Sequence, residues 1–276
     1  MAGRLLVCAT PIGNLGDVTL RVLDALHEAD LIAAEDTRVT AKLLARYGVS
    51  TPMEPYHAHN LGARTPVLVR RVRDGAVVAL VSDAGTPGVS DPGARLVDAC
   101  IEAGLPVEVL PGPSAIVTAL VASGLPTHAF YFGGFLPRKP GARRRALERL
   151  AGLDATLVFY ESPRRAAATL ASLAEVLPAR RAAMTRELTK VHEEVVRGEV
   201  GELAEALEGR ELRGEVVLLI GPPLPAPAEL PADEAIREGV DALVASGLTR
   251  SEAVRRYART HGLPRNAVYE AVHGSP

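Results

Sequence analysis

The sequence predicts an α/β protein with two α/β domains and a small C-terminal helical module. Short apolar runs alternate with amphipathic segments in the first part, a pattern typical of a mostly parallel sheet with both faces covered by helices. The second part has five strand candidates with few helices between them, which indicates a mixed sheet. A proline-rich stretch then leads into a segment with helical periodicity alone.

In the first part, we expect strands at 4–10, 30–36, 76–83 and 107–111, and helices at 19–29, 37–48, before residue 76, and at 92–103. Glycine-rich or polar stretches follow all four strands, namely TPIGNLGD, EDTR, SDAGTPG and PGPS. Ligands of parallel α/β sheets bind outside the carboxyl ends of the strands. The four loops therefore predict a ligand site at one edge of the sheet.

In the second part, the expected strands are 129–135, 156–161, 181–188, 192–200 and 214–221. The third and fourth of these leave little room for a crossover, so this half is expected to have a mixed sheet. The expected organisation is an N-terminal domain at 1–115, a second domain at 116–221, a linker at 222–231 and a helix–turn–helix-like module at 232–276.

Composition excludes several classes of protein. The net charge of −2 argues against binding nucleic acid through bulk charge, and six tyrosines, four phenylalanines and no tryptophan argue against a stacking platform for single strands. Cys8 and Cys100 lie in an expected strand and helix, so buried free thiols are expected, as in a reducing compartment. Without a signal peptide, membrane span or metal motif in the sequence, we expect a soluble cytoplasmic protein.

The SDAGTPGVSDPG stretch predicts a loop with two tasks. Gly85 and Gly88 allow positive φ angles and close approach of a ligand to the main chain. Ser90 or Asp91 is expected to cap the next helix, with Pro92 in its first turn. A turn does not require the carboxylate of Asp83, so this residue is the candidate ligand-binding group; loop architecture alone is the alternative.

Two serines stand at expected helix starts. Ser114, in PGPSA, offers a hydroxyl beside free main-chain N–H groups, which suits an anion or a polar ligand, with plain N-capping as the alternative. Ser162 precedes Pro163 and is expected to be a cap rather than a nucleophile, since no GxSxG motif surrounds it. The loops match neither GxGxxG nor a P-loop, which weakens an NAD or nucleoside-triphosphate interpretation.

Two local basic patches stand out, at 136–150 and in the tail from residue 248. The tail pattern LTRSEAVRRYARTHG–LPRNAVYEAV resembles a helix–turn–helix whose second helix opens at Arg265. The patches suggest a phosphate backbone as partner, although solvated helix faces would look similar. The candidate RNA-binding residues are Arg138, Lys139, Arg143, Arg144, Arg145, Arg164, Arg255, Arg256 and Arg265.

Seven motifs occur in a specific order: ATPIGNLGD, AEDTR, SDAGTPGVSDPG, PGPSA, GFLPRK, FYESPRR and RELTKVHEEV. In this order they resemble the ribosomal RNA small subunit methyltransferase I family of the tetrapyrrole-methylase superfamily. The resemblance covers residues 4 to about 221, and the tail resembles that family's C-terminal helix–turn–helix.

The resemblance implies S-adenosylmethionine-dependent 2′-O-methylation of a cytidine in 16S rRNA at the decoding centre, on naked rRNA or the 30S subunit. It also implies a homodimer and a cleft between the two α/β domains that holds the cofactor. Carried onto this sequence, the cofactor-binding residues are Thr10, Pro11, Asp83, Gly85, Thr86, Ser114, Ala115, Tyr160, Glu161, Leu188, Gly214 and Glu215.

A ribose hydroxyl attacks well only if its proton is removed during the reaction. Lys190, Glu187, Glu35 and Asp36 are the candidates to accept that proton or to orient the ribose. Two rival functions stay open: a tetrapyrrole C-methyltransferase of the same fold, and a non-catalytic DNA-binding regulator that acts through the tail. The basic patches favour RNA over a small macrocycle, and the convergent loops favour an enzyme over a regulator.

Overall fold

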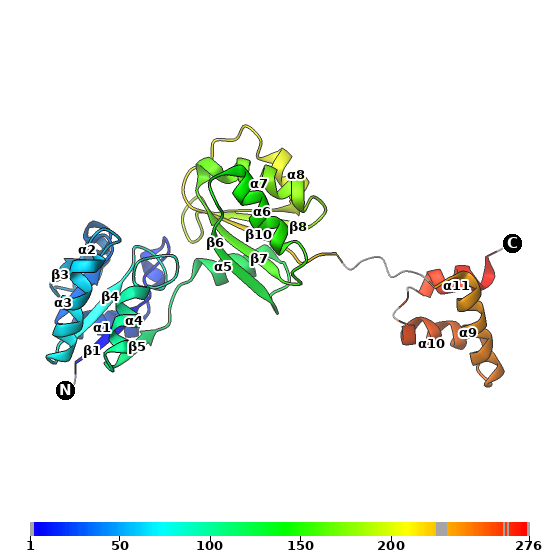
Figure 1. The fold of residues 1–276 in the computed structure, drawn as a ribbon, viewed down its shortest axis with the longest axis horizontal. Coiled ribbons are helices and arrows are strands. Elements are labelled where there is room, and N and C mark those ends of the chain that lie inside the picture. The colour runs from blue at the N-terminus through cyan, green and yellow to red at the C-terminus, as the bar shows by residue number, and fades with distance from the viewer. Residues whose placement is uncertain (1–2, 225–230, 262, 264, 275–276) are drawn as a thin grey trace. The chain divides into compact units, whose positions relative to one another are not determined.

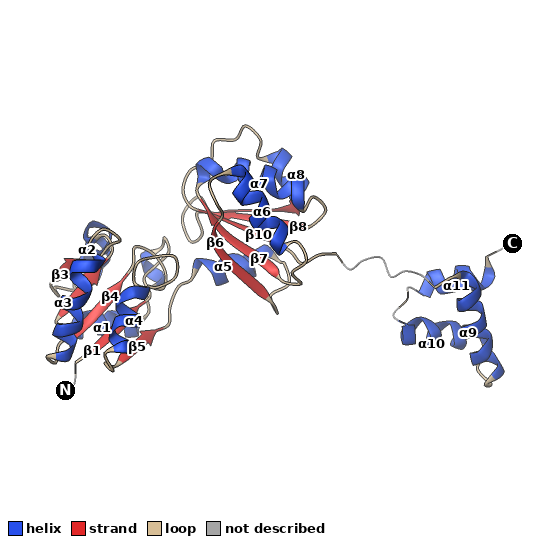
Figure 2. Ribbon diagram, viewed as in Figure 1, coloured by secondary structure: helices blue, strands red, loops and turns tan. Residues whose placement is uncertain are grey.

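The computed structural model describes residues 3–224, 231–261, 263 and 265–274. The chain forms two compact units, a first of residues 1–223 and a second of residues 224–276. Figure 1 labels the elements along the chain, and Figure 2 separates helices from strands. The first unit holds two sheets of five strands each.

The first sheet is parallel throughout, with the order β3-β2-β4-β1-β5. Its strands are β1 (Arg4–Cys8), β2 (Leu31–Ala34), β3 (Met53–Pro55), β4 (Val77–Val81) and β5 (Val107–Leu110). Between them lie a 3₁₀ turn (Leu15–Asp17), α1 (Leu20–Glu28), α2 (Thr37–Tyr47), α3 (Leu61–Arg73) and α4 (Ala94–Glu102). The predicted parallel sheet is thus confirmed.

Both faces of this sheet are buried, because successive side chains of a strand point to opposite faces. In β1, Leu6 and Cys8 join the core under α1 and α2, whereas Leu5 and Val7 join the core under α3 and α4. Cys8 and Cys100 are buried free cysteines, as predicted. Burial raises the pKa of the Cys8 thiol to about 12, so this thiol is unreactive.

The second sheet is mixed, with the order β6-β7-β10-β8-β9. Only the β6–β7 pair is parallel; β10 runs antiparallel to β7 and β8, and β8 runs antiparallel to β9. The strands are β6 (Phe130–Phe135), β7 (Thr156–Glu161), β8 (Arg181–Arg186), β9 (Glu194–Glu199) and β10 (Val216–Ile220). All five predicted strands and the predicted mixed sheet are confirmed.

Four helices cover the second sheet: α5 (Ala115–Ser123), α6 (Pro140–Leu150), α7 (Pro163–Val176) and α8 (Val200–Ala206). One core packs α6, α7 and α8 on one face. The other face is covered by α5 and is also contacted by Ile12 from the first sheet's loops. Because α5 already packs on the second sheet, the chain passes between the sheets in residues 111–114; the domain boundary at 115 stays a prediction.

The structure corrects two details of the first part. β3 was not predicted; its three residues include Glu54 and Pro55 and carry no apolar alternation. The expected N-cap at Ser90 or Asp91 is wrong, since α4 begins at Ala94 after Gly93. The carboxylate of Asp91 instead accepts hydrogen bonds from the N–H groups of Gly88 and Gly93, so it closes the loop rather than capping the helix.

The second unit contains α9 (Asp233–Ala245), α10 (Arg250–His261) and α11 (Arg265–His273). Their apolar faces share a core that includes Val240, Val254, Tyr257 and Val268. The two tail helices and the start of the second at Arg265 are as predicted. Of the predicted linker at 222–231, residues 225–230 lie outside the described residues.

A candidate cofactor and substrate site

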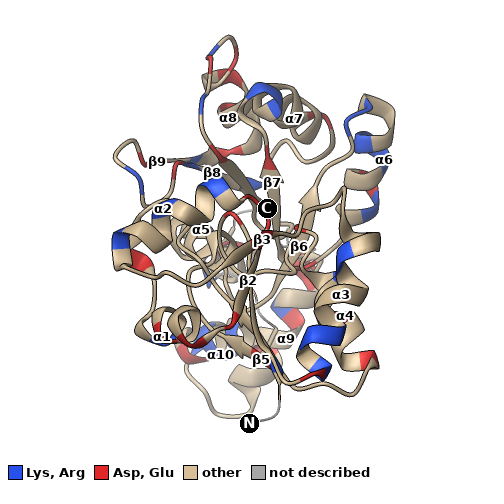
Figure 3. Ribbon diagram, turned by 90° about the vertical axis from the view of Figure 1, so that its left-hand side faces the viewer, with Lys and Arg blue, Asp and Glu red and all other residues tan. Residues whose placement is uncertain are grey.

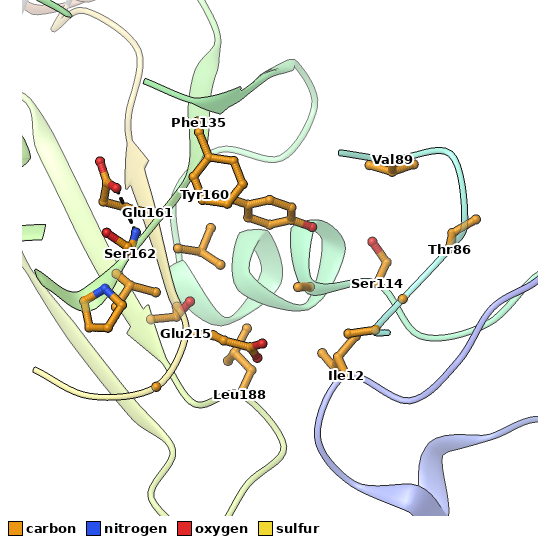
Figure 4. A pocket seen from close by; sticks show the side chains of 18 residues that line it. Ile12, Thr86, Val89, Ser114, Phe135, Tyr160, Glu161, Ser162, Leu188 and Glu215 are labelled. Atoms are coloured by element: carbon orange, nitrogen blue, oxygen red, sulfur yellow. Dashed lines mark hydrogen bonds between the residues drawn. The ribbon is translucent and has the colours of Figure 1, made fainter. Parts of the chain in front are cut away.

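Loops of the first sheet and strand ends of the second sheet enclose a pocket of about 380 Å³. Figure 4 shows Ile12, Thr86, Val89 and Ser114 on one side of it and side chains from the second sheet on the other. This volume lies in the range of small-molecule sites, roughly 300–1,000 Å³. The second sheet contributes Phe135, Tyr160, Glu161, Ser162, Pro163, Thr185, Leu188, Gly214, Glu215, Val216 and Val217.

The loops after β1 and β4 are joined directly beside this pocket. Thr10 and Gly85 exchange two main-chain hydrogen bonds of 2.9 and 3.0 Å, and the Thr10 hydroxyl donates to the carbonyl of Ser82. Gly85 has φ +78° and Gly88 has φ +96°, as their predicted role requires. The close approach of these main chains places Gly85 and Thr86 at the pocket wall.

Two hydroxyl groups at the pocket are not used by the fold. Ser114 is the N-cap residue of α5, but its side chain makes no capping hydrogen bond, and Figure 4 shows its hydroxyl turned toward the pocket. Thr185 in β8 is fully buried, and its hydroxyl has no hydrogen-bond partner among the described residues. Because a buried polar group without a partner is costly, Thr185 points to a polar ligand, and the half-buried Ser114 offers such a ligand a second hydroxyl.

Glu161 has a different role at the same wall. Its carboxylate accepts hydrogen bonds from the Ser162 N–H and the Thr169 hydroxyl, each at 2.7 Å, and pairs with Arg165 at 3.1 Å. Arg165 in turn donates to the carbonyl of Leu136. With these partners, the buried carboxylate fixes the wall of the pocket rather than facing a ligand. Ser162 stands at the N-cap position, as predicted, without a side-chain cap.

A second pocket, of about 400 Å³, adjoins the first and shares Ile12, Ala84 and Glu215 with it. It lies between the loop after β1, the loop after β4 and one face of α2, with Lys190 at its wall. Thr10, Pro11 and Asp83, which were predicted to bind the cofactor, line this second pocket and not the first.

Three carboxylates gather where β2 and β4 end. The Asp83 N–H donates to Glu35 at 3.2 Å, and the Asp83 carboxylate accepts from the Asp36 N–H at 3.0 Å. Burial, with the neighbouring carboxylates, raises the pKa of Glu35, and burial also raises that of Asp83. Asp36 differs, since its hydrogen bonds from Arg38 lower its pKa to about 2.

Lys190 is held by two carboxylates of the second sheet. Its Nζ lies 2.8 Å from Glu187 Oε1 and 3.0 Å from Glu215 Oε2. Burial alone would lower the pKa of Lys190, but these hydrogen bonds outweigh burial and raise it. The hydrogen bond from Lys190 lowers the pKa of Glu187. Lys190 is therefore a fixed cation at the second pocket, and its stem packs against Gly13.

Nine of the predicted cofactor residues line the first pocket: Gly85, Thr86, Ser114, Ala115, Tyr160, Glu161, Leu188, Gly214 and Glu215. Of the four catalytic candidates, Lys190 lines a pocket, whereas Glu187, Glu35 and Asp36 line neither of the two. Sequence reasoning missed Ile12, Phe135, Thr185 and Val217. Thr185 in β8 and Val217 in β10 are cross-strand partners. In the sequence both look like core residues, so the strand register is needed to show that they line the pocket.

The candidate RNA-binding residues differ in accessibility. Figure 3 shows the basic residues along α6. Arg143 is 5% exposed and donates to Ser172 and to the carbonyl of Ala168, so its prediction as an RNA ligand is wrong. Arg144 pairs with Glu148 at 2.9 Å. The exposed residues of the set are Arg138, Lys139, Arg144, Arg145 and Arg164 in the first unit, and Arg255, Arg256 and Arg265 in the second.

Within the described ranges, no cluster of His, Cys, Asp or Glu is arranged to hold a metal ion. The helices described are also all too short or too polar to cross a bilayer.

Comparison with known proteins identifies the relatives of this chain. Residues 4–204 match the family of Tetrapyrrole (Corrin/Porphyrin) Methylases. The chain is 44% identical to the Ribosomal RNA small subunit methyltransferase I of Synechocystis sp., over 97% of this chain and 96% of the relative. It is 46% identical to the protein of the same name from Mesorhizobium japonicum, over 96% of this chain and 90% of the relative.

A solved structure has the same fold. The Uroporphyrin-III C-methyl transferase from Thermus thermophilus, complexed with S-adenyl homocysteine, is 25% identical, has a TM-score of 0.56 and covers 79% of this chain and 97% of its own. The match to most of the first unit and the full-length identity above therefore place this chain in the tetrapyrrole methylase family, among the relatives called ribosomal RNA small subunit methyltransferase I.

Proposed function

We propose that this protein transfers a methyl group from S-adenosylmethionine to the ribose 2′-oxygen of a cytidine in the 16S rRNA of the small ribosomal subunit. The observation that carries the proposal is the full-length likeness, at 44–46% identity, to relatives named for methylation of that RNA. The likeness to a tetrapyrrole enzyme is lower, at 25%, which favours RNA over a macrocycle as substrate.

The residues of the first pocket fit the cofactor. Its apolar wall, with Tyr160, Leu188 and Val217, suits an adenine ring, and the hydroxyls of Ser114 and Thr185 supply polar contacts that the fold leaves open. The positive φ of Gly85 permits close approach to the main chain. When bound, S-adenosylmethionine supplies an electrophilic methyl group on a sulfonium centre. The protein's part is then mainly to position the reactants and to exclude water.

The proton of the ribose hydroxyl needs an acceptor, and we assign this role to Asp83. Asp36 is neutralised by Arg38, Glu35 and Glu187 line neither pocket, and Lys190 is a cation. Asp83 lines the second pocket next to Ala84, which faces both pockets. The Asp83 carboxylate would accept the proton of the ribose hydroxyl as that oxygen takes up the methyl group, and Lys190 would orient the ribose by hydrogen bonding.

The exposed basic residues on either side of α6 and in the second unit are proposed to contact phosphates, which positions the RNA without reading its sequence.

We also propose a cytoplasmic homodimer. Large apolar side chains are exposed on the edge strand β6 and on α5, including Phe130, Tyr131, Val117 and Val121, the last at 70%. Sedimentation of the full chain at micromolar concentration should give twice the monomer mass.

The direct test is transfer of labelled methyl from S-adenosylmethionine to 30S subunits, to naked 16S rRNA and to a uroporphyrinogen in parallel. The proposal expects label in an rRNA sample and none in the macrocycle. Label in the macrocycle alone would instead support the tetrapyrrole enzyme. No label in any acceptor, with sequence-specific binding to duplex DNA, would support the regulator.

A further inference from the structure

The second pocket contains a polar group that the fold does not use. Thr40 lies in α2, lines this pocket and is 3% exposed, yet its hydroxyl has no hydrogen-bond partner within the described part of the chain. A threonine inside a helix often bonds back to the carbonyl four residues earlier, but the Thr40 hydroxyl makes no such bond to the carbonyl of Asp36. The buried hydroxyl thus points to a ligand in this pocket.

The wall around Thr40 is apolar although it faces the opening. Val39 is 39% exposed and Leu15 is 37% exposed, and Leu43 lines the same wall from the next turn of α2. Aliphatic side chains beside one unpaired hydroxyl suit a flat heterocycle that carries hydrogen-bonding groups at its edge.

Charged side chains also line this pocket. Lys42 is an exposed side chain of α2 at the pocket and has no ion pair among the described residues. Asp83, Lys190 and Glu215 lie where the second pocket meets the first. The Lys42 cation suits a phosphate, and the Asp83 carboxylate with the Lys190 ammonium suits a hydroxyl that is both bound and deprotonated.

We propose that this pocket receives the target nucleotide as a single ribonucleotide turned out of the RNA, with its base against Thr40, Val39 and Leu43, its phosphate at Lys42 and its ribose at Asp83. Enzymes that do chemistry on a base take its nucleotide out of the stack into a pocket of this kind, and the same movement would bring this ribose to Asp83. A tetrapyrrole with several carboxylates fits this place poorly, because Asp83 and Glu215 stand in its wall. The inference rests on the proposed function and adds the substrate's binding site to it.

The test uses the full chain with cytidine 5′-monophosphate as the probe, followed by methyl NMR of leucine and valine. We expect shifts at Leu15, Val39 and Leu43, and none at Leu68 and Val72, which lie in the core on the opposite face of the first sheet. Thr40→Val removes the hydroxyl and keeps the shape, so the affinity for the probe should fall roughly five- to tenfold.

Lys42→Gln should weaken binding of cytidine 5′-monophosphate but leave that of cytidine unchanged. The matched control is Arg46→Gln, which removes a charge from the same helix at a residue outside the pocket and should change neither. The proposal is overturned if no shift occurs at Val39 and Leu43, or if Arg46→Gln weakens the probe as much as Lys42→Gln.

The two proposals fail separately. If the probe binds at α2 as expected but no methyl reaches rRNA, the proposed function fails and the nucleotide site stands. If rRNA is methylated and the probe shifts only residues of the first pocket, the nucleotide site fails and the proposed function stands.

Discussion

The carboxylate of Glu187 occupies the space that a side chain at position 214 would need. A Cβ built on Gly214 would overlap the Glu187 carboxyl group, and Gly214 has φ +90°. The same carboxylate accepts hydrogen bonds from Lys190 Nζ and from the Glu215 N–H. The turn at Gly214 therefore allows the arrangement that fixes Lys190 at the wall of the second pocket.

Gly214→Ala should destabilise the protein by about 2–4 kcal/mol, because the added methyl group both strains the backbone and displaces Glu187. Urea unfolding measures this loss. The matched control is Gly209→Ala, whose φ is +71° but whose Cβ would meet no atom within 4 Å, so it should show only the backbone cost of about 1 kcal/mol. Equal losses in the two variants would show that Glu187 does not need the space.

Thr185→Val should weaken binding of S-adenosylmethionine roughly five- to tenfold, because the ligand loses a partner in the first pocket. The ligand-free protein should keep its stability or gain up to about 1 kcal/mol, since a buried hydroxyl without a partner is removed. Titration calorimetry and urea unfolding measure the two effects.

The control for that variant is Thr156→Val. Thr156 is also fully buried, but its hydroxyl donates to the carbonyl of Pro126 at 2.7 Å. This variant should lose about 1 kcal/mol of stability and keep its affinity for the cofactor. If Thr185→Val loses stability and keeps cofactor affinity, its hydroxyl serves the fold and not the ligand.

Glu35 and Asp36 should give stability–pH profiles of opposite slope. The folded state raises the pKa of Glu35, so ionisation of Glu35 costs stability as pH rises above its ordinary range. Glu35→Gln should therefore gain stability relative to the unaltered protein as pH rises from about 4 to about 7.

The pKa of Asp36 is lowered, so its ionised form stabilises the fold above the ordinary range of an aspartate, and this contribution is lost as pH falls toward about 2. Asp36→Asn should accordingly be less stable than the unaltered protein at neutral pH, with a difference that shrinks in acid. Denaturant midpoints across this range measure both. Stability–pH profiles of the same slope for the two variants would contradict the opposite pKa shifts of Glu35 and Asp36.

Two neighbouring arginines of α6 should behave differently. Arg143→Ala removes a buried side chain together with its hydrogen bonds to the Ser172 hydroxyl and the Ala168 carbonyl, and should cost about 1–3 kcal/mol of stability. Arg145→Ala, at an exposed position, should leave stability unchanged, weaken binding to 16S rRNA and reduce the salt dependence of that binding by about one phosphate contact. Fluorescence anisotropy at several salt concentrations, on folded protein, separates the two. A loss of RNA affinity with Arg143→Ala at full stability would restore it as a ligand.

The sequence was sufficient for every strand of the two sheets except the short edge strand β3, because the other strands are apolar runs with turn residues near their ends. It failed where tertiary contacts decide. Asp91 looks like a helix cap by its position, but its carboxylate meets the N–H groups of the folded loop. Arg143 looks like part of a basic patch, yet it lies one helical turn before the buried Leu147 and so faces the core.

The candidate site was predictable where loop motifs form it, as with Gly85, Thr86 and Ser114. It was not predictable where it depends on which strand positions face the pocket, as with Thr185, or on the packing of a helix against two loops, as with Thr40. Both threonines have buried hydroxyls without a partner in the part of the chain that the structure describes, a property that only the folded structure reveals.

The central claim is that the methyl group is placed on a ribose oxygen of the small-subunit rRNA. The most direct measurement is partial alkaline hydrolysis of 16S rRNA after incubation with the protein and S-adenosylmethionine, since a methylated 2′-oxygen cannot attack the adjacent phosphate. The account predicts one new gap in the cleavage ladder, at a cytidine. An unchanged ladder together with methyl label on a base, or a ladder unchanged with no label at all, would contradict it.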